Sequence, residues 1–171
     1  MTIYKLDKQR GGSLPVYQRL LRRIQSLQLK RKNHSGGVIR LYIALYRMMS
    51  LLYCNEISYK AEIGPGLFIG HPYGITVNPN AKIGNNCNIH KGVTIGQENR
   101  GKRKGAPTIG NNVWIGINST IVGKIIIGDD VLIAPNSYVN CDVPSHSIVF
   151  GNPCIIKHSD CATKGYINNA I

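Results

Sequence analysis

His71 is the residue with the clearest potential for chemistry. It follows the apolar segment that ends at Ile69 and directly precedes Pro72, so it is predicted to stand at a corner and to point away from the core. A hydroxyl group is a weak nucleophile at neutral pH, and a neutral imidazole can take its proton as it attacks a carbonyl carbon. A lone histidine is more often a surface or packing residue, so a catalytic role depends on what surrounds it.

A carboxylate would make such a base more effective. A carboxylate at the second ring nitrogen fixes the tautomer and stabilises the imidazolium that forms. Glu56 lies fifteen residues before His71 and is the preferred candidate, and Glu62 is the nearest rival. The alternative for Glu56 is a solvated carboxylate at the edge of the fold.

A ladder of aliphatic residues organises the region that carries these groups. Its step is six residues, except for a step of eight between Ile75 and Ile83 and one of fourteen between Ile95 and Ile109. The members are Ile57, Ile63, Ile69, Ile75, Ile83, Ile89, Ile95, Ile109, Ile115, Ile121, Ile127, Ile133 and Val139. A short fixed period with one β-branched residue per unit is typical of a parallel β-helix. Three hexads form one triangular coil, so Glu56 and His71 are separated by most of one coil and can approach.

The rest of the chain divides around this ladder. Residues 1–14 are predicted to form a polar, mobile leader, 15–55 a helical segment, 56–156 the β-helix and 157–171 a polar tail. Apolar periodicity predicts helices over Val16–Leu29 and Val38–Tyr53. The excursion Gln97–Thr108 is polar, basic and glycine-containing, which predicts a surface loop.

The charge of the chain is strongly positive. The formal net charge is +13, and basic residues gather in the first fifty positions and again at Arg100, Lys102, Arg103 and Lys104. Such clusters favour anionic partners, although nothing here resembles a nucleic-acid recognition fold. The second helix is too interrupted by arginines to span a bilayer. It is expected to pack on the β-helix, and a contact with the surface of an anionic membrane is a second, compatible interpretation. An odd number of cysteines, five, without CxxC spacing fits a reducing cytoplasm, where we expect the protein to reside.

Several motifs carry a resemblance to a known family. They are Glu56-Ile57, the segment 63–74 (IGPGLFIGHPYG), 92–96 (GVTIG), 112–116 (NVWIG) and 151–153 (GNP). With them, about residues 36–156 resemble the hexapeptide-repeat acyltransferases, in the serine acetyltransferase-like branch and close to the polysaccharide O-acetyltransferases. The resemblance implies a left-handed parallel β-helix, acetyl-CoA as co-substrate and a homotrimer with active sites between neighbouring subunits.

The resemblance also assigns roles to residues. It implies His71 as general base, with Glu56 at a position where serine acetyltransferases carry aspartate, and it places the oxyanion donor at Gly96 or Gln97. The implied contacts with coenzyme A are Gly116, Ile117, Ala134, Pro135, Gly151, Asn152, Pro153 and Lys157. The basic loop residues would face the acceptor. No metal is expected, because His71 and His90 do not fall in one matched column.

Missing side chains indicate the class of acceptor. Serine acetyltransferases carry Asp-His at the catalytic corner and Arg-His before the proline that ends the insertion, whereas this chain has Gly70 and Gly105-Ala106. Loss of these charged contacts should weaken the binding of a free amino acid. The sequence therefore predicts O-acetylation of a sugar hydroxyl, such as a capsular or exopolysaccharide unit. Serine O-acetylation is the alternative, and a non-catalytic oligomeric scaffold is a third possibility.

Overall fold

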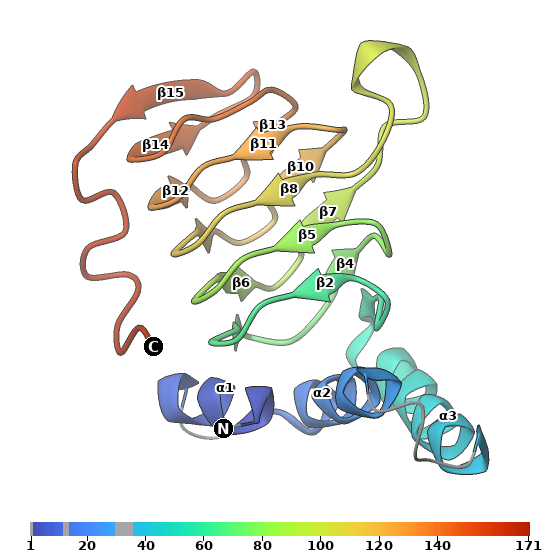
Figure 1. Ribbon diagram of the computed structural model, residues 1–171. Coiled ribbons are helices and arrows are strands. Elements are labelled where there is room, and N and C mark those ends of the chain that lie inside the picture. Colours follow the sequence, from blue (N-terminus) through green and yellow to red (C-terminus); the bar gives the residue numbers. More distant parts are fainter. Residues whose placement is uncertain (1, 12–13, 30–35) are drawn as a thin grey trace.

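Three parallel sheets wrap around one apolar core. The computed structural model describes residues 2–11, 14–29 and 36–171, and the strands stack as coils of a β-helix (Figure 1). Sheet A contains β1 (Glu56–Ile57), β4 (Thr76–Val77), β7 (Thr94–Gly96), β10 (Thr120–Val122) and β13 (Tyr138–Val139). Sheet B contains β2 (Glu62–Ile63), β5 (Lys82–Ile83), β8 (Thr108–Ile109) and β11 (Ile126–Ile127). Sheet C contains β3 (Phe68–Gly70), β6 (Asn88–His90), β9 (Trp114–Ile115), β12 (Val131–Ile133), β14 (Ser147–Phe150) and β15 (Ile155–His158).

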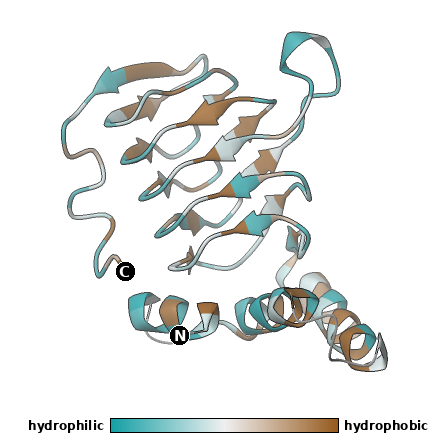
Figure 2. Ribbon diagram, in the orientation of Figure 1, coloured by the Kyte–Doolittle hydropathy of each residue, from teal (hydrophilic) through white to brown (hydrophobic). Residues whose placement is uncertain are grey.

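The predicted ladder forms the core of this β-helix. All thirteen aliphatic side chains of the ladder are buried. In each strand of sheets A and B an exposed or half-buried residue comes first, and the next residue points inward. In Figure 2 the apolar colour accordingly recurs in the strands from coil to coil, next to hydrophilic residues. A parallel β-helix with a helical N-terminal segment, as the repeat predicted, is therefore confirmed.

The phase of the ladder differs from the prediction at one place. Ile57 pairs with Val77, and Val77 pairs with Ile95, so Val77 rather than Ile75 is the inward residue of strand β4. Five residues separate Gly70 from Thr76 in the first coil, whereas three separate the paired residues His90 and Thr94 in the second. The two extra residues therefore lie in the corner that contains His71, and not between Ile75 and Ile83. Ile75 is fully buried as well, which is why it could pass for the anchor in the sequence.

Three helices cover the N-terminal end of the β-helix (Figure 1). Helix α2 (Val16–Leu29) has the predicted bounds, and α3 (Gly36–Tyr53) begins two residues before the predicted start. Where the sequence predicted a mobile leader, α1 (Ile3–Gly11) packs against the first coils. Polar residues do this packing: Asp7 is fully buried, and Arg10 donates to the carbonyl of Gly66 at 2.5 Å. A search for apolar periodicity finds no signal in such a helix.

One face of α3 is apolar and exposed. Tyr46 is its one buried residue, whereas Leu51 is 80% exposed, and Leu41, Leu45, Met48 and Leu52 are also exposed. Among the described helices, none is long and apolar enough to cross a membrane. Contact of this face with a membrane surface stays a prediction.

The C-terminal tail is fastened to the β-helix through Asp130. Its carboxylate accepts hydrogen bonds from the backbone N–H groups of Ala162 (3.1 Å) and Thr163 (3.0 Å) and from the Thr163 hydroxyl (2.6 Å). His146 Nδ1 lies 2.9 Å from the same carboxylate. Further along the tail, the ring of Tyr166 lies 4.9 Å from that of Trp114.

The anchorage of the tail should depend on pH. Burial raises the pKa of Asp130, but the hydrogen bonds from Thr163, His146 and Ala162 outweigh burial, so the pKa of Asp130 lies below its usual value of 3.8. A depressed carboxyl pKa stabilises the anchored tail above about pH 4 and loses that contribution as the pH falls through the folded-state pKa. We expect Asp130→Ala to red-shift the emission of Trp114, the one tryptophan of the chain, at neutral pH, and acid to do the same in the wild type. Asp160→Asn, at an exposed carboxylate that pairs with His158, is the control, and unchanged emission in Asp130→Ala would contradict this role.

Candidate active site

His71 occupies the irregular corner between sheets C and A. It follows β3, is exposed, and adopts a left-handed backbone conformation with φ of 55°. Asn55 holds this corner from the start of sheet A: its side chain donates to the carbonyl of Pro72 at 2.8 Å and accepts from the N–H of Ile75 at 2.8 Å. A second link joins the N–H of Gly74 to the carbonyl of Tyr53 at 3.1 Å. The corner thus presents the imidazole outward on a backbone that is fixed on both sides.

A second histidine lies directly behind this corner. His90 pairs with Gly70 in sheet C, and its Nδ1 lies 2.9 Å from the carbonyl oxygen of Ile115 in the next coil. The centroid of its ring lies 4.7 Å from that of Trp114, with the two rings tilted by 49°, and Trp114 in turn contacts Tyr166. Burial lowers the pKa of His90, and the nearby His71 lowers it further against the opposing effect of the bond to Ile115. His90 is therefore neutral at physiological pH.

Glu56 lies on the same side of the fold but is not bonded to His71. Strand β1 pairs Glu56 with Thr76, and the carboxylate is exposed, with the hydrogen-bonded Asn55 next to it in the chain. Among the described residues no hydrogen bond joins Glu56 to His71. The rival Glu62 forms an exposed ion pair with Lys82 at 3.3 Å in sheet B, away from this corner. Glu56 therefore remains the better placed carboxylate, and its catalytic role stays a prediction.

The predicted coenzyme A positions form one edge of the β-helix. Pairing in sheet C aligns Ile69, Ile89, Ile115, Ile133 and Val149, so the two residues that follow each of these positions stack in two columns. The inner column is Gly70, His90, Gly116, Ala134 and Phe150, and the outer column is Lys91, Ile117, Pro135 and Gly151, with His71 beside its first member. Four steps of about 4.8 Å make this edge about 19 Å long. Within it a Cβ on Gly116 would lie 2.6 Å from the nitrogen of Pro135, so the coils approach closely there.

The closing turn continues this edge. Gly151, Asn152 and Pro153 are exposed in the turn between β14 and β15, which pair antiparallel. Lys157 returns along β15, and its ammonium lies 5.6 Å from the centroid of the Phe150 ring. The structure thus brings these four predicted residues to the far end of the edge that begins at His71.

Gly96 and Gln97 lie at the opposite end of sheet A. They end β7 and begin the long loop, whereas His71 stands where the chain enters sheet A. Five residues of extended chain, on the order of 15 Å, separate these two corners. Within one chain the structure therefore does not bring the predicted oxyanion donors to His71.

The basic loop projects from the same corner as Gly96 (Figure 1). It contains the short helix η2 (Gly101–Arg103), and Arg103 donates from its guanidinium to the carbonyl of Asn140 on its own β-helix. Arg100, Lys102 and Lys104 are exposed. All four predicted loop residues are therefore open to solvent, and Arg103 also has a structural contact.

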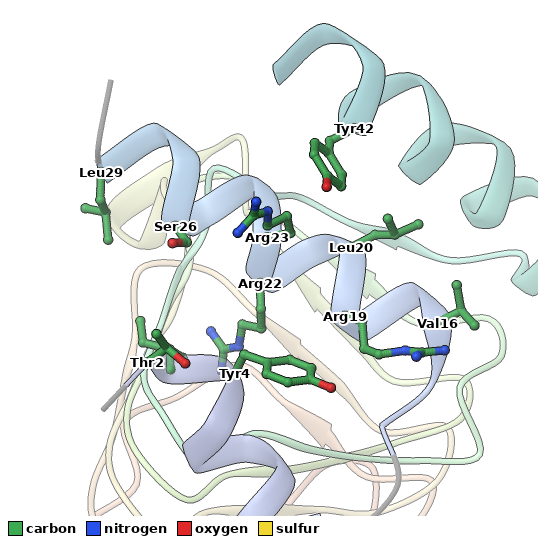
Figure 3. Close-up of a pocket in the computed structure, with 11 residues that line it drawn as sticks. Thr2, Tyr4, Val16, Arg19, Leu20, Arg22, Arg23, Ser26, Leu29 and Tyr42 are labelled. Carbon is green, nitrogen blue, oxygen red and sulfur yellow. The ribbon is translucent and has the colours of Figure 1, made fainter. Parts of the chain in front are cut away.

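A groove of about 760 Å³ lies elsewhere, between the three helices. Figure 3 shows Tyr4 of α1, Arg19 and Arg23 of α2 and Tyr42 of α3 on its walls. It contains none of the residues with predicted chemistry, and in the described part of the chain no group of three or more potential metal ligands was found. The corner of His71 therefore stays the candidate site for the predicted chemistry.

Two residues of this site escaped the prediction. Asn55 was overlooked although it directly precedes Glu56, because an asparagine has no distinctive pattern of its own. His90 was considered only as a metal ligand. The sequence does hold a signal for His90: the glycine before His71 pairs with a histidine one coil later. This pairing can be recognised only when the strands are aligned in the correct register.

Comparisons with known proteins decide the family. The model of the bacterial transferase hexapeptide family (six repeats) matches residues 106–141. The serine acetyltransferase of Helicobacter pylori (strain ATCC 700392 / 26695) is 36% identical over 132 residues, which cover 75% of this chain and 77% of that protein. This chain belongs to the serine acetyltransferase family. It is an acyltransferase, as the motifs predicted.

Solved structures agree with this assignment. The serine acetyltransferase of Neisseria gonorrhoeae in complex with serine has a TM-score of 0.68 and 33% identity, and the match covers 82% of this chain and 55% of that one. The Brucella abortus (strain S19) enzyme in complex with coenzyme A has a TM-score of 0.71 and 28% identity, covering 84% and 55%. This chain therefore spans little more than half the length of these two structures.

The predicted sugar acceptor is wrong on these findings. Relatives of this chain at 35–40% identity are named serine acetyltransferases, and the similar solved structures include one with serine bound. The prediction rested on the side chains missing at Gly70, Gly105 and Ala106. An absent group does not exclude a ligand when another residue can take its place, and His90 occupies the space beside Gly70.

Proposed function

We propose that this protein is a serine O-acetyltransferase that uses acetyl-CoA. The observation that supports this best is the position of His71, exposed on a constrained corner at one end of the edge that carries the predicted coenzyme A contacts. A thioester bound along that edge would place its acyl group beside the imidazole. The relatives named above act on serine, and one was solved with coenzyme A.

The proposed reaction is a direct transfer. His71 takes the proton of the serine hydroxyl as the oxygen attacks the thioester carbonyl carbon. The tetrahedral intermediate carries an oxyanion that a backbone N–H group stabilises. Collapse of the intermediate expels the coenzyme A thiolate, which receives the proton from the His71 imidazolium. Glu56 is proposed to hold the imidazole during these steps.

The oxyanion donors are proposed to come from a second copy of the chain. Gly96 and Gln97 lie at the other end of sheet A from His71, so a single chain leaves the site incomplete. A homotrimer would bring the loop of one subunit to the corner of the next. The exposed loop residues Arg100, Lys102 and Lys104 would then face the acceptor, where their charge suits the serine carboxylate.

The assay for this function is thiol release from acetyl-CoA. We expect L-serine to raise the rate of thiol release well above the rate without an acceptor. The product should be O-acetyl-L-serine, with one acetyl group transferred for each thiol released. Thiol release that does not depend on L-serine would contradict the proposal.

A further inference from the structure

The imidazole of His90 spans the gap between three successive coils. On one side Nδ1 lies 2.9 Å from the carbonyl oxygen of Ile115. On the other side the ring rests against Gly70: a Cβ built there would lie 2.5 Å from Cδ2 and 2.8 Å from Nε2 of His90. No larger residue fits at position 70 while His90 keeps this place.

The hydrogen bond to Ile115 determines which nitrogen of His90 is available. A carbonyl oxygen can only accept, so Nδ1 must carry the proton, and the neutral ring then has its lone pair on Nε2. Nε2 has no hydrogen-bond partner in the described part of the chain, and it is not among the fully buried polar atoms that lack one there. It is therefore an acceptor that solvent or a ligand can reach.

This acceptor stands where serine acetyltransferases are expected to have a carboxylate. The motif comparison places Asp at position 70, directly before the catalytic histidine, and this chain has Gly70 followed by His71. A serine molecule presented to His71 carries an ammonium group that needs a hydrogen-bond acceptor when it leaves water. Burial, which lowers the pKa of His90, keeps the ring neutral and able to accept.

We propose that Nε2 of His90 accepts a hydrogen bond from the α-ammonium group of the acceptor, so that His90 takes the place of the carboxylate lost at Gly70. This inference rests on the proposed function, since it names how the same site recognises an amino acid. His90 is in this view a specificity residue for the acceptor, and Trp114 and Ile115 hold its ring in position.

The test compares two acceptors that differ only in the amino group. They are L-serine and 3-hydroxypropanoate, and the quantity measured is the ratio of their kcat/KM values. His90→Ala removes the acceptor at Gly70 together with the donor to the Ile115 carbonyl, and a loss of packing alone should affect both acceptors alike. Because a hydrogen bond to a charged group contributes about 1.5–3 kcal/mol, we expect the preference for serine to fall roughly 10- to 100-fold in this variant.

A second variant separates recognition from packing. Gly70→Asp combined with His90→Ala returns a carboxylate to the vacated space and should restore the preference for serine. Gly70→Asp alone should not, because its Cβ would collide with the His90 ring. An unchanged preference in His90→Ala, or an equal loss of rate with both acceptors, would overturn the inference while leaving the proposed function intact. A wild type without serine-dependent turnover would refute the proposed function itself, and the inference with it.

Discussion

Replacing His71 with asparagine should abolish most of the acetyl transfer and leave the fold unchanged. Asparagine tolerates the left-handed backbone that His71 adopts, and it keeps a polar side chain at the exposed corner. It cannot take the proton of the serine hydroxyl. General base catalysis contributes about 10²–10⁴-fold, so we expect kcat to fall by that factor. The measurement is thiol release at saturating L-serine and acetyl-CoA.

A matched histidine serves as the control for this variant. His158 is also exposed and lies on β15, where it pairs with the exposed Asp160, and its replacement by alanine should leave kcat unchanged. The thermal unfolding of both variants should match the wild type, because neither side chain is buried. A kcat of His71→Asn within a few-fold of the wild type would exclude His71 as the base.

Replacing Asp7 with asparagine should lower the free energy of unfolding more than any other substitution named here. Asp7 and Arg22 are 0% and 2% exposed, and their closest atoms, Asp7 Oδ2 and Arg22 Nε, are 2.6 Å apart. Asp7 also accepts from the backbone N–H groups of Gly66 and Leu67, which ties α1 and α2 to the first coil. The variant leaves a buried guanidinium without its counter-ion. Breaking a buried pair in this way costs about 3–5 kcal/mol, which we expect to lower the melting temperature by about 10 °C.

An exposed ion pair provides the contrast. Glu62 and Lys82 are 3.3 Å apart, with side chains that are 72% and 57% exposed. Such pairs contribute less than about 1 kcal/mol, so Glu62→Gln should unfold close to the wild type. Circular dichroism at a single protein concentration compares the variants fairly, because oligomers change stability with concentration. Equal melting temperatures for Asp7→Asn and Glu62→Gln would show that the buried pair does not stabilise the helical cap.

The β-helix itself could be predicted because its buried residues recur with a fixed period in the sequence. Each coil repeats the same burial pattern, so the ladder of isoleucines predicts the fold and the approximate position of most strands. The error at Ile75 arose where the repeat is interrupted. Ile75 and Val77 are both apolar and both buried, and only the pairing of Val77 with Ile57 and Ile95 distinguishes them. The interruption coincides with the corner of His71, as expected where a local rule is broken for function.

Contacts between distant parts of the chain could not be predicted in the same way. Helix α1 docks through Asp7 and Arg10, and their partners on the β-helix lie more than fifty residues away in the sequence. His90 and Gly70 are adjacent only through strand pairing. The acceptor was misjudged for the same reason, since the sequence records the missing aspartate but not the imidazole that fills its space.

The most direct test of the account is the identity of the product. The purified protein, incubated with acetyl-CoA and L-serine, should form O-acetyl-L-serine, identified by mass spectrometry, in step with thiol release. His71→Asn should form it at least about a hundredfold more slowly. Thiol release by the wild type without any O-acetyl-L-serine, or an equal yield from His71→Asn, would contradict the assignment of this corner as the active site.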